Sequence, residues 1–206
     1  KYCLRLHREK EIRFLEPACG TGSFFSALLR SITSHRITKA VGVEIDERFV
    51  QAAQRLWSAH GLHIIHGDFT HTETLPNYKA SLLITNPPYV RHHHLTQDDK
   101  ARLVARASRE LGITPSRLSG LYLHFILLSH RLLAPGAISA WLIPAEFMDV
   151  NYGRALKEYL TKTVSLLRIH KFDPADVQFD DALVTSAIVV FKNTNPDKTL
   201  PVEFTS

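Results

Sequence analysis

Cysteine, methionine and long apolar runs are scarce in this 206-residue chain. Its two cysteines, Cys3 and Cys19, are too few for a disulfide framework, which excludes the small disulfide-bonded secreted domains and fits the reducing cytoplasm. No apolar run approaches the length of about 20 residues that crosses a bilayer. The opening Lys1-Tyr2-Cys3 leads into charged residues rather than into the apolar stretch of a signal peptide. The sequence therefore predicts a cytoplasmic protein without a membrane partner.

The net charge of the chain is modest and positive. Lys and Arg number 25 against 20 Asp and Glu, so the formal net charge is +5 before 12 histidines are considered. The isoelectric point is near 9.3. A basic excess suits a polyanionic partner because each neutralised phosphate releases counterions. Taken alone, this balance permits nucleic acid as a partner and does not prove it.

What the chain does contain is a regular succession of short apolar runs and amphipathic segments. This alternation predicts an α/β domain with a mostly parallel sheet and helices on both faces. Strands are expected at residues 12–16, 41–45, 63–66, 81–85, 138–143, 166–170 and 184–191, and helices at about 23–32, 46–61, 96–112, 120–133 and 152–163. The second helix is expected to bury Phe49, Val50, Ala53, Leu56 and Trp57. Ligands of such sheets bind beyond the carboxyl ends of the strands, so the residues that follow each strand are candidates for a site.

The first two strands end in a glycine-containing turn and an acidic residue. The turn reads Glu16-Pro17-Ala18-Cys19-Gly20-Thr21-Gly22-Ser23-Phe24. Its glycines let the backbone approach a ligand and expose amides at a helix N-terminus. A plain structural turn explains Gly-x-Gly about as well, and the third glycine of the dinucleotide fingerprint is missing. Glu44 ends the second strand, where a carboxylate can accept both hydroxyls of a ribose.

The third strand is followed by Asp68 and Phe69. The carboxylate can accept a hydrogen bond from an adenine amino group, and the aromatic ring can lie against the base. Either residue alone is more typical of a loop acid or a core aromatic. Their place in the series of strand ends favours the ligand.

The fourth strand ends in Asn86-Pro87-Pro88-Tyr89. The prolines fix φ and carry no amide donor, so the Asn86 side-chain oxygen and the Pro87 carbonyl can face one NH2 group as paired acceptors. Tyr89 supplies a face on which a planar target can stack. A tight turn is the competing interpretation. Because three motifs precede it in the expected order, we interpret the tetrapeptide as catalytic.

Together these motifs resemble the N6-adenine DNA methyltransferases of the gamma arrangement, in the branch with an Asn-Pro-Pro-Tyr tetrapeptide that occurs in bacterial restriction–modification systems. The resemblance covers roughly Phe14 to Lys192. It implies a Rossmann-like S-adenosylmethionine-dependent methyltransferase fold, with a mostly parallel seven-stranded sheet and one antiparallel strand near its edge. It also implies methyl transfer from S-adenosylmethionine to N6 of an adenine flipped out of double-stranded DNA, with S-adenosylhomocysteine as the second product.

The resemblance assigns roles by position. Phe125, in the helix that opens at Leu121, matches an aromatic beside the cofactor's adenine, and Phe179 falls where the family holds a second aromatic against the flipped base. The predicted catalytic residues are Asn86, Pro87, Pro88 and Tyr89, and the predicted base-stacking residues are Tyr89 and Phe179. The predicted cofactor-binding residues are Glu16, Ala18, Gly20, Gly22, Phe24, Glu44, Ile45, Asp68, Phe69, Asn86 and Phe125.

The domain organisation follows from the same resemblance. The chain lacks an initiator Met, and nothing after about Lys192 matches the family's target-recognition domain. We expect residues 1–206 to be a methyltransferase catalytic domain taken from a longer protein. Target-recognition and nuclease parts are expected to be fused to it or separate.

Basic residues follow the tetrapeptide at Arg91-His92-His93-His94. Consecutive side chains are expected to point in divergent directions, and no Cys or acidic partner has zinc spacing around them, so we expect no metal site. Arg91 and His92 are predicted instead to contact the DNA backbone.

Two alternatives stay open. A protein glutamine amide or an RNA adenine offers the same NH2 geometry to the tetrapeptide, although the Glu-Pro-Ala-Cys-Gly opening and the polar stretch after Tyr89 favour DNA. The chain could also be an inactive cofactor- or DNA-binding module of a larger assembly. The intact tetrapeptide argues against that second alternative.

Overall fold

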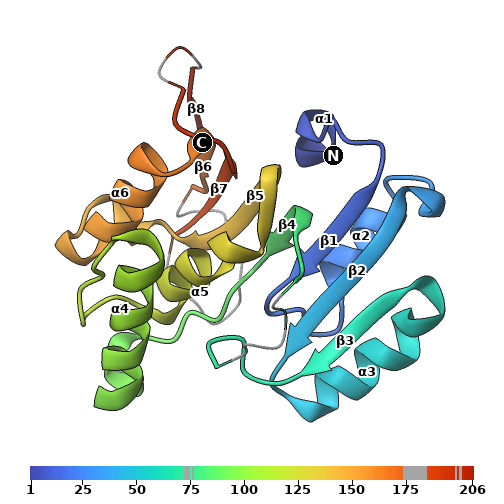
Figure 1. Ribbon diagram of the computed structural model, residues 1–206, viewed down its shortest axis with the longest axis horizontal. Helices are drawn as coiled ribbons and strands as arrows, with labels where there is room; N and C mark the ends of the chain where they lie inside the picture. The colour runs from blue at the N-terminus through green and yellow to red at the C-terminus, as the bar shows by residue number, and fades with distance from the viewer. Residues whose placement is uncertain (72–74, 76, 174–184, 198, 200) are drawn as a thin grey trace.

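The computed structural model describes residues 1–71, 75, 77–173, 185–197, 199 and 201–206. Its centre is one sheet with the strand order β3-β2-β1-β4-β5-β7-β6-β8, which twists across the molecule in Figure 1. The strands are β1 (Ile12–Glu16), β2 (Ile37–Glu44), β3 (Leu62–His66), β4 (Ala80–Thr85), β5 (Leu133–Pro144), β6 (Ser165–Lys171), β7 (Ser186–Lys192) and β8 (Glu203–Thr205).

The direction of β7 distinguishes it from its neighbours. It pairs antiparallel with both β5 and β6, whereas the other strand pairs of the sheet are parallel. A mostly parallel sheet with one antiparallel strand near its edge is the arrangement that the sequence predicted. All seven expected strands are present, and the short β8 adds an eighth beside β6.

Helices cover both faces of the sheet because successive strand residues point to opposite sides. Phe14 of β1 belongs to the core cluster under α2 and α3, and the next residue, Leu15, belongs to the cluster under α4, α5 and α6. In β4, Leu82 likewise belongs to the cluster under α2 and α3, and Leu83 to the cluster under α4, α5 and α6. The helices are α1 (Tyr2–Leu6), α2 (Ser23–Leu29), α3 (Glu47–Trp57), α4 (Gln97–Leu111), α5 (Leu121–Ser129) and α6 (Arg154–Lys162), with short 3-10 turns between several of them.

Capping residues set the helix boundaries that the sequence predicted. At the start of α3, Asp46 accepts a hydrogen bond from the Arg48 amide, and at the start of α4 Thr96 accepts one from the Asp99 amide. Gly112 ends α4 in the left-handed conformation, with φ +68, which a residue without a Cβ atom adopts readily. These local signals needed no tertiary contact to be recognised.

Several boundaries lie a few residues from the expectation, and two of them meet between α5 and β5. The helix was expected to run to residue 133 and the strand to begin at residue 138, but α5 already ends at Ser129, and Pro135 and Gly136 lie inside β5. The β4–β5 register is irregular there, moving from Ala80↔Leu133 to Leu82↔Ile138. Proline is tolerated at such an irregularity because no ladder hydrogen bond is required from its nitrogen.

Within the described ranges, no helix combines the length and the apolar character that a membrane span requires.

His124 of α5 makes the stability of the fold sensitive to acid. Its side chain is buried, and burial first, then the nearby Arg102, lower its pKa from 6.5 to about 4. Between these two values the unfolded chain binds a proton that the folded chain does not. The free energy of unfolding therefore falls as pH drops through this window, by about 1.4 kcal/mol per pH unit and about 3 kcal/mol in all.

We expect His124→Leu to remove this component. Urea unfolding of both proteins between pH 7 and pH 4.5 measures it, because the variant should lose less stability than the parent as pH falls. Parallel pH profiles of the two proteins would contradict the assignment.

Candidate active site

A cavity of about 390 Å³ opens at the carboxyl ends of β1 to β4, beside the start of α5. Its wall contains eight of the eleven predicted cofactor residues, namely Ala18, Gly20, Glu44, Ile45, Asp68, Phe69, Asn86 and Phe125. They come from four strand ends and one helix, which the parallel sheet brings to one edge. We refer to this space as the cofactor cavity.

The Glu44 carboxylate fixes the backbone around this cavity. Its Oε2 accepts a hydrogen bond from the Gly20 amide at 2.8 Å, and its Oε1 accepts from the amides of Ile45 and Asp46, each at 2.9 Å. Three of about four acceptor positions of the carboxylate are therefore occupied by the protein itself. Glu44 thus ties the β1 turn to the end of β2, and its remaining acceptor position on Oε2 is available to a ligand hydroxyl.

We expect Glu44→Gln to weaken cofactor binding by roughly 10- to 100-fold. The substituted amide presents an NH2 group to a backbone amide donor, and an unpaired buried donor costs about 1–3 kcal/mol. Calorimetric titration with S-adenosylhomocysteine measures this loss. The matched control is Glu47→Gln, an exposed glutamate in the first turn of α3, which should stay within twofold of the parent protein. Equal affinities for all three proteins would contradict the role of Glu44.

Three predicted cofactor residues do not line the cofactor cavity. Glu16 is 2% exposed, and burial raises its pKa well above its usual range. Gly22 has φ +84 and lies against Trp57, whose Nε1 would be 2.5 Å from a Cβ atom at position 22. Phe24 lines a separate apolar cavity of about 420 Å³ between α1, α2 and the sheet. A role for these three residues in cofactor binding stays a prediction.

Aromatic rings from two elements meet at the cavity wall. The rings of Phe69, after β3, and Phe125, in α5, have centroids 5.1 Å apart and an interplanar angle of 37°. Both side chains are 5% exposed. Asp68 stands beside them at the same wall. This arrangement offers a carboxylate acceptor next to an apolar surface, which suits a planar ring that carries an amino group.

Asn86 has the most unusual environment of the predicted catalytic residues. Within the described part of the chain, its Oδ1 is shielded from solvent and has no hydrogen-bond partner. Buried acceptors are nearly always paired in folded proteins, and an exception indicates strain or a functional role. Asn86 and Pro88 both line the cofactor cavity. No donor among the described residues therefore occupies this oxygen, and the residue that carries it belongs to the cavity wall.

Tyr89 faces the neighbouring cavity, which encloses about 310 Å³. Burial raises the pKa of its phenol, and a hydrogen bond with Ser186 offsets part of that shift. Val90 lines both cavities, so the tetrapeptide separates two adjoining spaces. Arg91 and His92 line the second space with Tyr89. The last predicted stacking residue, Phe179, lies outside the described residues.

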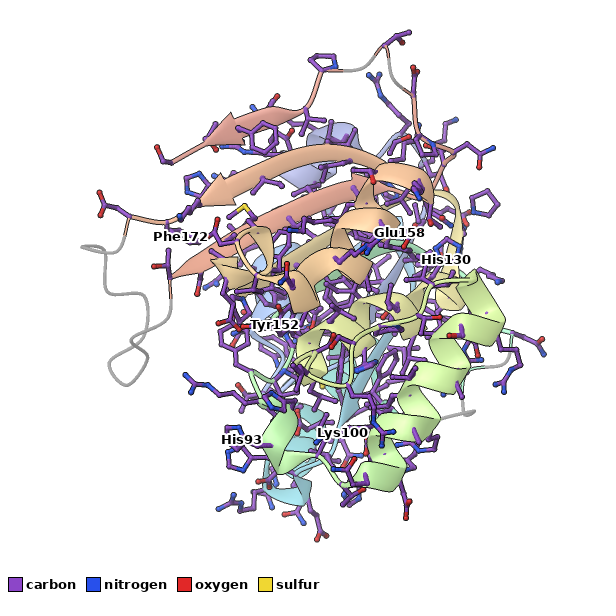
Figure 2. The ribbon with its side chains drawn as sticks, turned by 90° about the vertical axis from the view of Figure 1, so that its left-hand side faces the viewer. His93, Lys100, His130, Tyr152, Glu158 and Phe172 are labelled. Atoms are coloured by element: carbon purple, nitrogen blue, oxygen red, sulfur yellow. The ribbon has the colours of Figure 1, made fainter. Side chains whose placement is uncertain are left out.

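The histidine run is more compact than the sequence suggested. Residues His92–His94 form a 3-10 turn, and the ring centroids of His93 and His94 are 4.1 Å apart rather than divergent. Figure 2 shows His93 on the same side of the molecule as Tyr152 and Phe172. Across the described residues, no group of three or more His, Cys, Asp or Glu side chains is placed to hold a metal ion.

Sequence reasoning missed part of the cavity wall. Phe49 was expected to be buried on the inner face of α3, but it is 45% exposed and lines the cofactor cavity. Leu56 of the same helix is also exposed, at 53%, while Val50 and Ala53 are buried as expected. The other cavity residues that were missed are Pro17, Val43, Gly67, Val90 and Leu121. Pro17 and Gly67 lie inside or beside recognised motifs, so adjacency was the signal that could have identified them.

The known proteins whose sequences resemble this chain are methyltransferases, as the residues at the cavity suggest. A family model, the Eco57I restriction-modification methylase, matches residues 44–178. The type II methyltransferase M.XamI of Xanthomonas campestris pv. amaranthicola is 31% identical over 196 residues, which cover 93% of this chain and 36% of that protein. The tRNA1(Val) (adenine(37)-N6)-methyltransferase of Pseudoalteromonas atlantica is 31% identical over 144 residues, 65% of this chain and 49% of that protein. The chain thus spans between about a third and a half of the length of these relatives.

The fold also has counterparts among solved structures. A Listeria monocytogenes protein assigned to the class I S-adenosylmethionine-dependent methyltransferases aligns with the whole of this chain and 62% of its own, with a TM-score of 0.75 and 18% identity. At that identity the likeness concerns the fold alone. It confirms the S-adenosylmethionine-dependent methyltransferase fold that the sequence predicted.

Proposed function

Since this chain belongs to the Eco57I family of restriction-modification methylases, we propose that residues 1–206 are the catalytic domain of a methyltransferase that acts on adenine N6 in DNA. Family membership confirms the predicted class of enzyme, with S-adenosylmethionine as its cofactor. The choice of an amino nitrogen as the target rests on one observation. It is the buried Asn86 Oδ1, which has no partner among the described residues and stands at the cofactor cavity.

The residues of the cofactor cavity fit the parts of S-adenosylmethionine. Phe69 and Phe125 provide an apolar surface for the adenine ring, and the Asp68 carboxylate provides an acceptor for its amino group. The free acceptor position of Glu44 suits a ribose hydroxyl. When bound, the cofactor supplies a methyl group on a positively charged sulfur.

Asn86 acts on the nitrogen that receives the methyl group. Its Oδ1 and the Pro87 carbonyl accept hydrogen bonds from the target NH2 group, which draws the nitrogen toward tetrahedral geometry and frees its lone pair. With its lone pair freed in this way, the nitrogen would be able to receive the methyl group that the cofactor supplies, and its surplus proton would pass to water. Tyr89 stacks on the extruded base and offsets the few kcal/mol that unstacking costs.

A protein nucleophile has no part in this proposal. The one cysteine near the site, Cys19, is 4% exposed, and burial followed by the carboxylates of Glu16 and Glu44 raises its pKa to about 12. Its thiol is therefore uncharged at neutral pH and unreactive as a nucleophile. Its Sγ would lie 2.7 Å from a Cβ atom at position 42, so Cys19 packs against Gly42 as a small core residue.

The test compares substrates directly. The longest available protein that contains these residues is incubated with labelled methyl donor and, separately, with duplex DNA, tRNA and a glutamine-containing protein. Each product is digested and analysed by mass spectrometry. N6-methyldeoxyadenosine from DNA supports the proposal. Methylation of RNA adenine or of glutamine in place of DNA, or no turnover on any substrate, contradicts it.

Partners of this domain belong to the same proposal. Arg91 and His92 stand beside Tyr89 at the second cavity, where they suit contacts with the phosphates that flank the flipped adenine. Because relatives of this chain are longer, we place DNA-sequence recognition, and any nuclease, in parts outside these residues, either fused or separate. Such a protein acts in the cytoplasm, on the DNA of the cell.

A further inference from the structure

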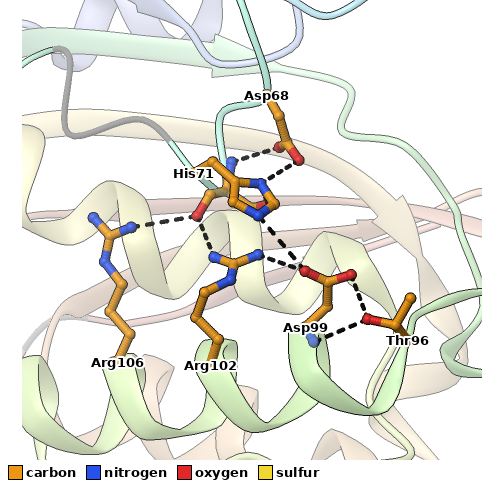
Figure 3. A network of polar contacts seen from close by, with 7 residues as sticks. Asp68, His71, Thr96, Asp99, Arg102 and Arg106 are labelled. Carbon is orange, nitrogen blue, oxygen red and sulfur yellow. Dashed lines mark hydrogen bonds and ion pairs between the residues drawn. The ribbon is translucent and has the colours of Figure 1, made fainter.

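The loop that carries Asp68 is tied to α4 by a network of polar contacts, shown in Figure 3. Asp68 Oδ1 accepts a hydrogen bond from the Thr70 amide at 2.8 Å, and Asp68 Oδ2 is 2.7 Å from His71 Nδ1. A carboxylate only accepts, so His71 Nδ1 is the donor of this bond. Both oxygens of Asp68 are therefore held in place, and each retains an acceptor position for a ligand.

The same loop is held from the side of α4. Asp99 Oδ1 lies 2.9 Å from Arg102 Nη2 and 3.6 Å from His71 Nε2, and the second contact is an ion pair when the imidazole carries a proton on both nitrogens. Thr96 donates to Asp99 Oδ2 at 2.7 Å, and hydrogen bonds from Arg102 and Thr96 lower the pKa of Asp99, so it stays ionised at neutral pH.

Two guanidinium groups of α4 converge on one backbone atom of the loop. Arg102 Nη1 donates to the Thr70 carbonyl at 2.7 Å, and Arg106 Nη1 reaches the same oxygen at 3.4 Å. The loop is thus fixed through its backbone as well as through His71. None of the three α4 residues, Asp99, Arg102 and Arg106, lines the cofactor cavity, so any effect on a ligand must act through Asp68.

We propose that His71 is a positioning residue, held by Asp99 and Arg102 of α4, that aims the Asp68 carboxylate at the exocyclic amino group of the cofactor's adenine. The inference rests on the proposed function, because it takes S-adenosylmethionine as the ligand of the cofactor cavity. The Asp68 side chain is 34% exposed, and without His71 it can rotate toward water. Fixing it in advance removes an ordering cost that would otherwise weaken binding.

A purely structural network makes a different prediction. If His71 and Arg102 only stabilise α4, their loss lowers affinity for every ligand of the cavity by the same factor. If His71 acts through Asp68, removing His71 lowers affinity mainly for the ligand that carries the amino group. The chemistry of position 6 of the purine therefore separates the two roles.

The experiment measures that difference by calorimetry. S-Adenosylhomocysteine is compared with S-inosylhomocysteine, in which a carbonyl acceptor replaces the amino donor. The protein is again the longest available chain that contains these residues. We expect the parent protein to prefer the adenine ligand by at least about tenfold, because the inosine carbonyl faces a carboxylate. Asp68→Ala should remove the preference.

His71→Ala should reduce the preference to within about threefold, mainly by weakening the adenine ligand. His71→Asn places an amide donor near the position of Nδ1 and should restore most of it. Arg102→Ala should lower the preference in the same direction. The matched control is His35→Ala, an exposed histidine on the opposite end of the sheet from the cavity, which should leave the preference unchanged.

Melting temperatures of all variants report whether each is folded. A preference that survives in His71→Ala while Asp68→Ala abolishes it overturns the positioning role. An equal loss of affinity for both ligands in His71→Ala overturns it as well. An unchanged preference in Arg102→Ala overturns the role assigned to α4. A parent protein that binds both ligands equally contradicts this inference but leaves the proposed cofactor in place. A parent protein that binds neither ligand contradicts the proposed function itself.

Discussion

Replacing Asn86 with alanine is expected to lower the rate of methyl transfer by roughly 100- to 1,000-fold or more, while cofactor affinity stays within severalfold. Removing one prearranged polar group from an active site costs about this much when the group acts mainly in the transition state. The side-chain oxygen of Asn86 is such a group, because it is buried and has no partner in the described part of the protein. Single-turnover measurement with saturating DNA and donor gives the rate, and calorimetry gives the affinity.

The matched control is Asn195→Ala. Asn195 is exposed in the loop after β7, at the end of the sheet away from the cofactor cavity, because β7 runs antiparallel to β5. The control should retain the parent rate. If the Asn86→Ala protein keeps most of its rate, the Asn86 oxygen does not have the catalytic role on which the proposed function rests. A loss of cofactor binding equal to the loss of rate points to a damaged cavity rather than to a missing acceptor.

Replacing Gly153 with alanine is expected to destabilise the fold by about 3 kcal/mol, which lowers the melting temperature by roughly 6–12 °C for a domain of this size. A Cβ atom at position 153 would lie 2.7 Å from the carbonyl carbon of Phe147 and 2.8 Å from its Cα, and closer still to its carbonyl oxygen. Phe147 is buried in the 3-10 turn that directly follows β5, so its backbone cannot move aside cheaply.

Gly112→Ala provides the comparison because the two glycines differ in one respect. Gly153 has φ −75 and ψ −7, values that alanine adopts freely, so the cost there is steric overlap alone. Gly112 has φ +68 but no atom within 4 Å of a new Cβ, so the cost there is backbone strain of about 1 kcal/mol. Thermal unfolding of both variants should rank Gly153→Ala as the less stable. The reverse order would show that the Phe147 backbone yields to the added methyl group.

The edge of the sheet that carries the site could be predicted from the sequence because it depends on strand order and direction only. Parallel strands bring their carboxyl ends to one edge. The motifs at Gly20, Glu44, Asp68 and Asn86 therefore had to converge, although the first and the last lie 66 positions apart in the chain. The family followed from the order of the same motifs. Helix ends at Asp46, Thr96 and Gly112 were equally local.

Tertiary structure alone decided how these residues are used. Nothing near Glu44 in the sequence indicates that its carboxylate is occupied by the amide of Gly20, and nothing near Gly22 indicates that Trp57 lies against it. His71 gave no signal at all, because its partner Asp99 belongs to a helix that begins 26 residues later, at Gln97. Composition and periodicity describe one segment at a time, whereas a hydrogen bond or a steric contact joins two segments whose distance is fixed only once the sheet and its helices have packed. The sequence therefore determined which residues gather at the site, and the packed molecule determined which of their polar atoms remain free to bind.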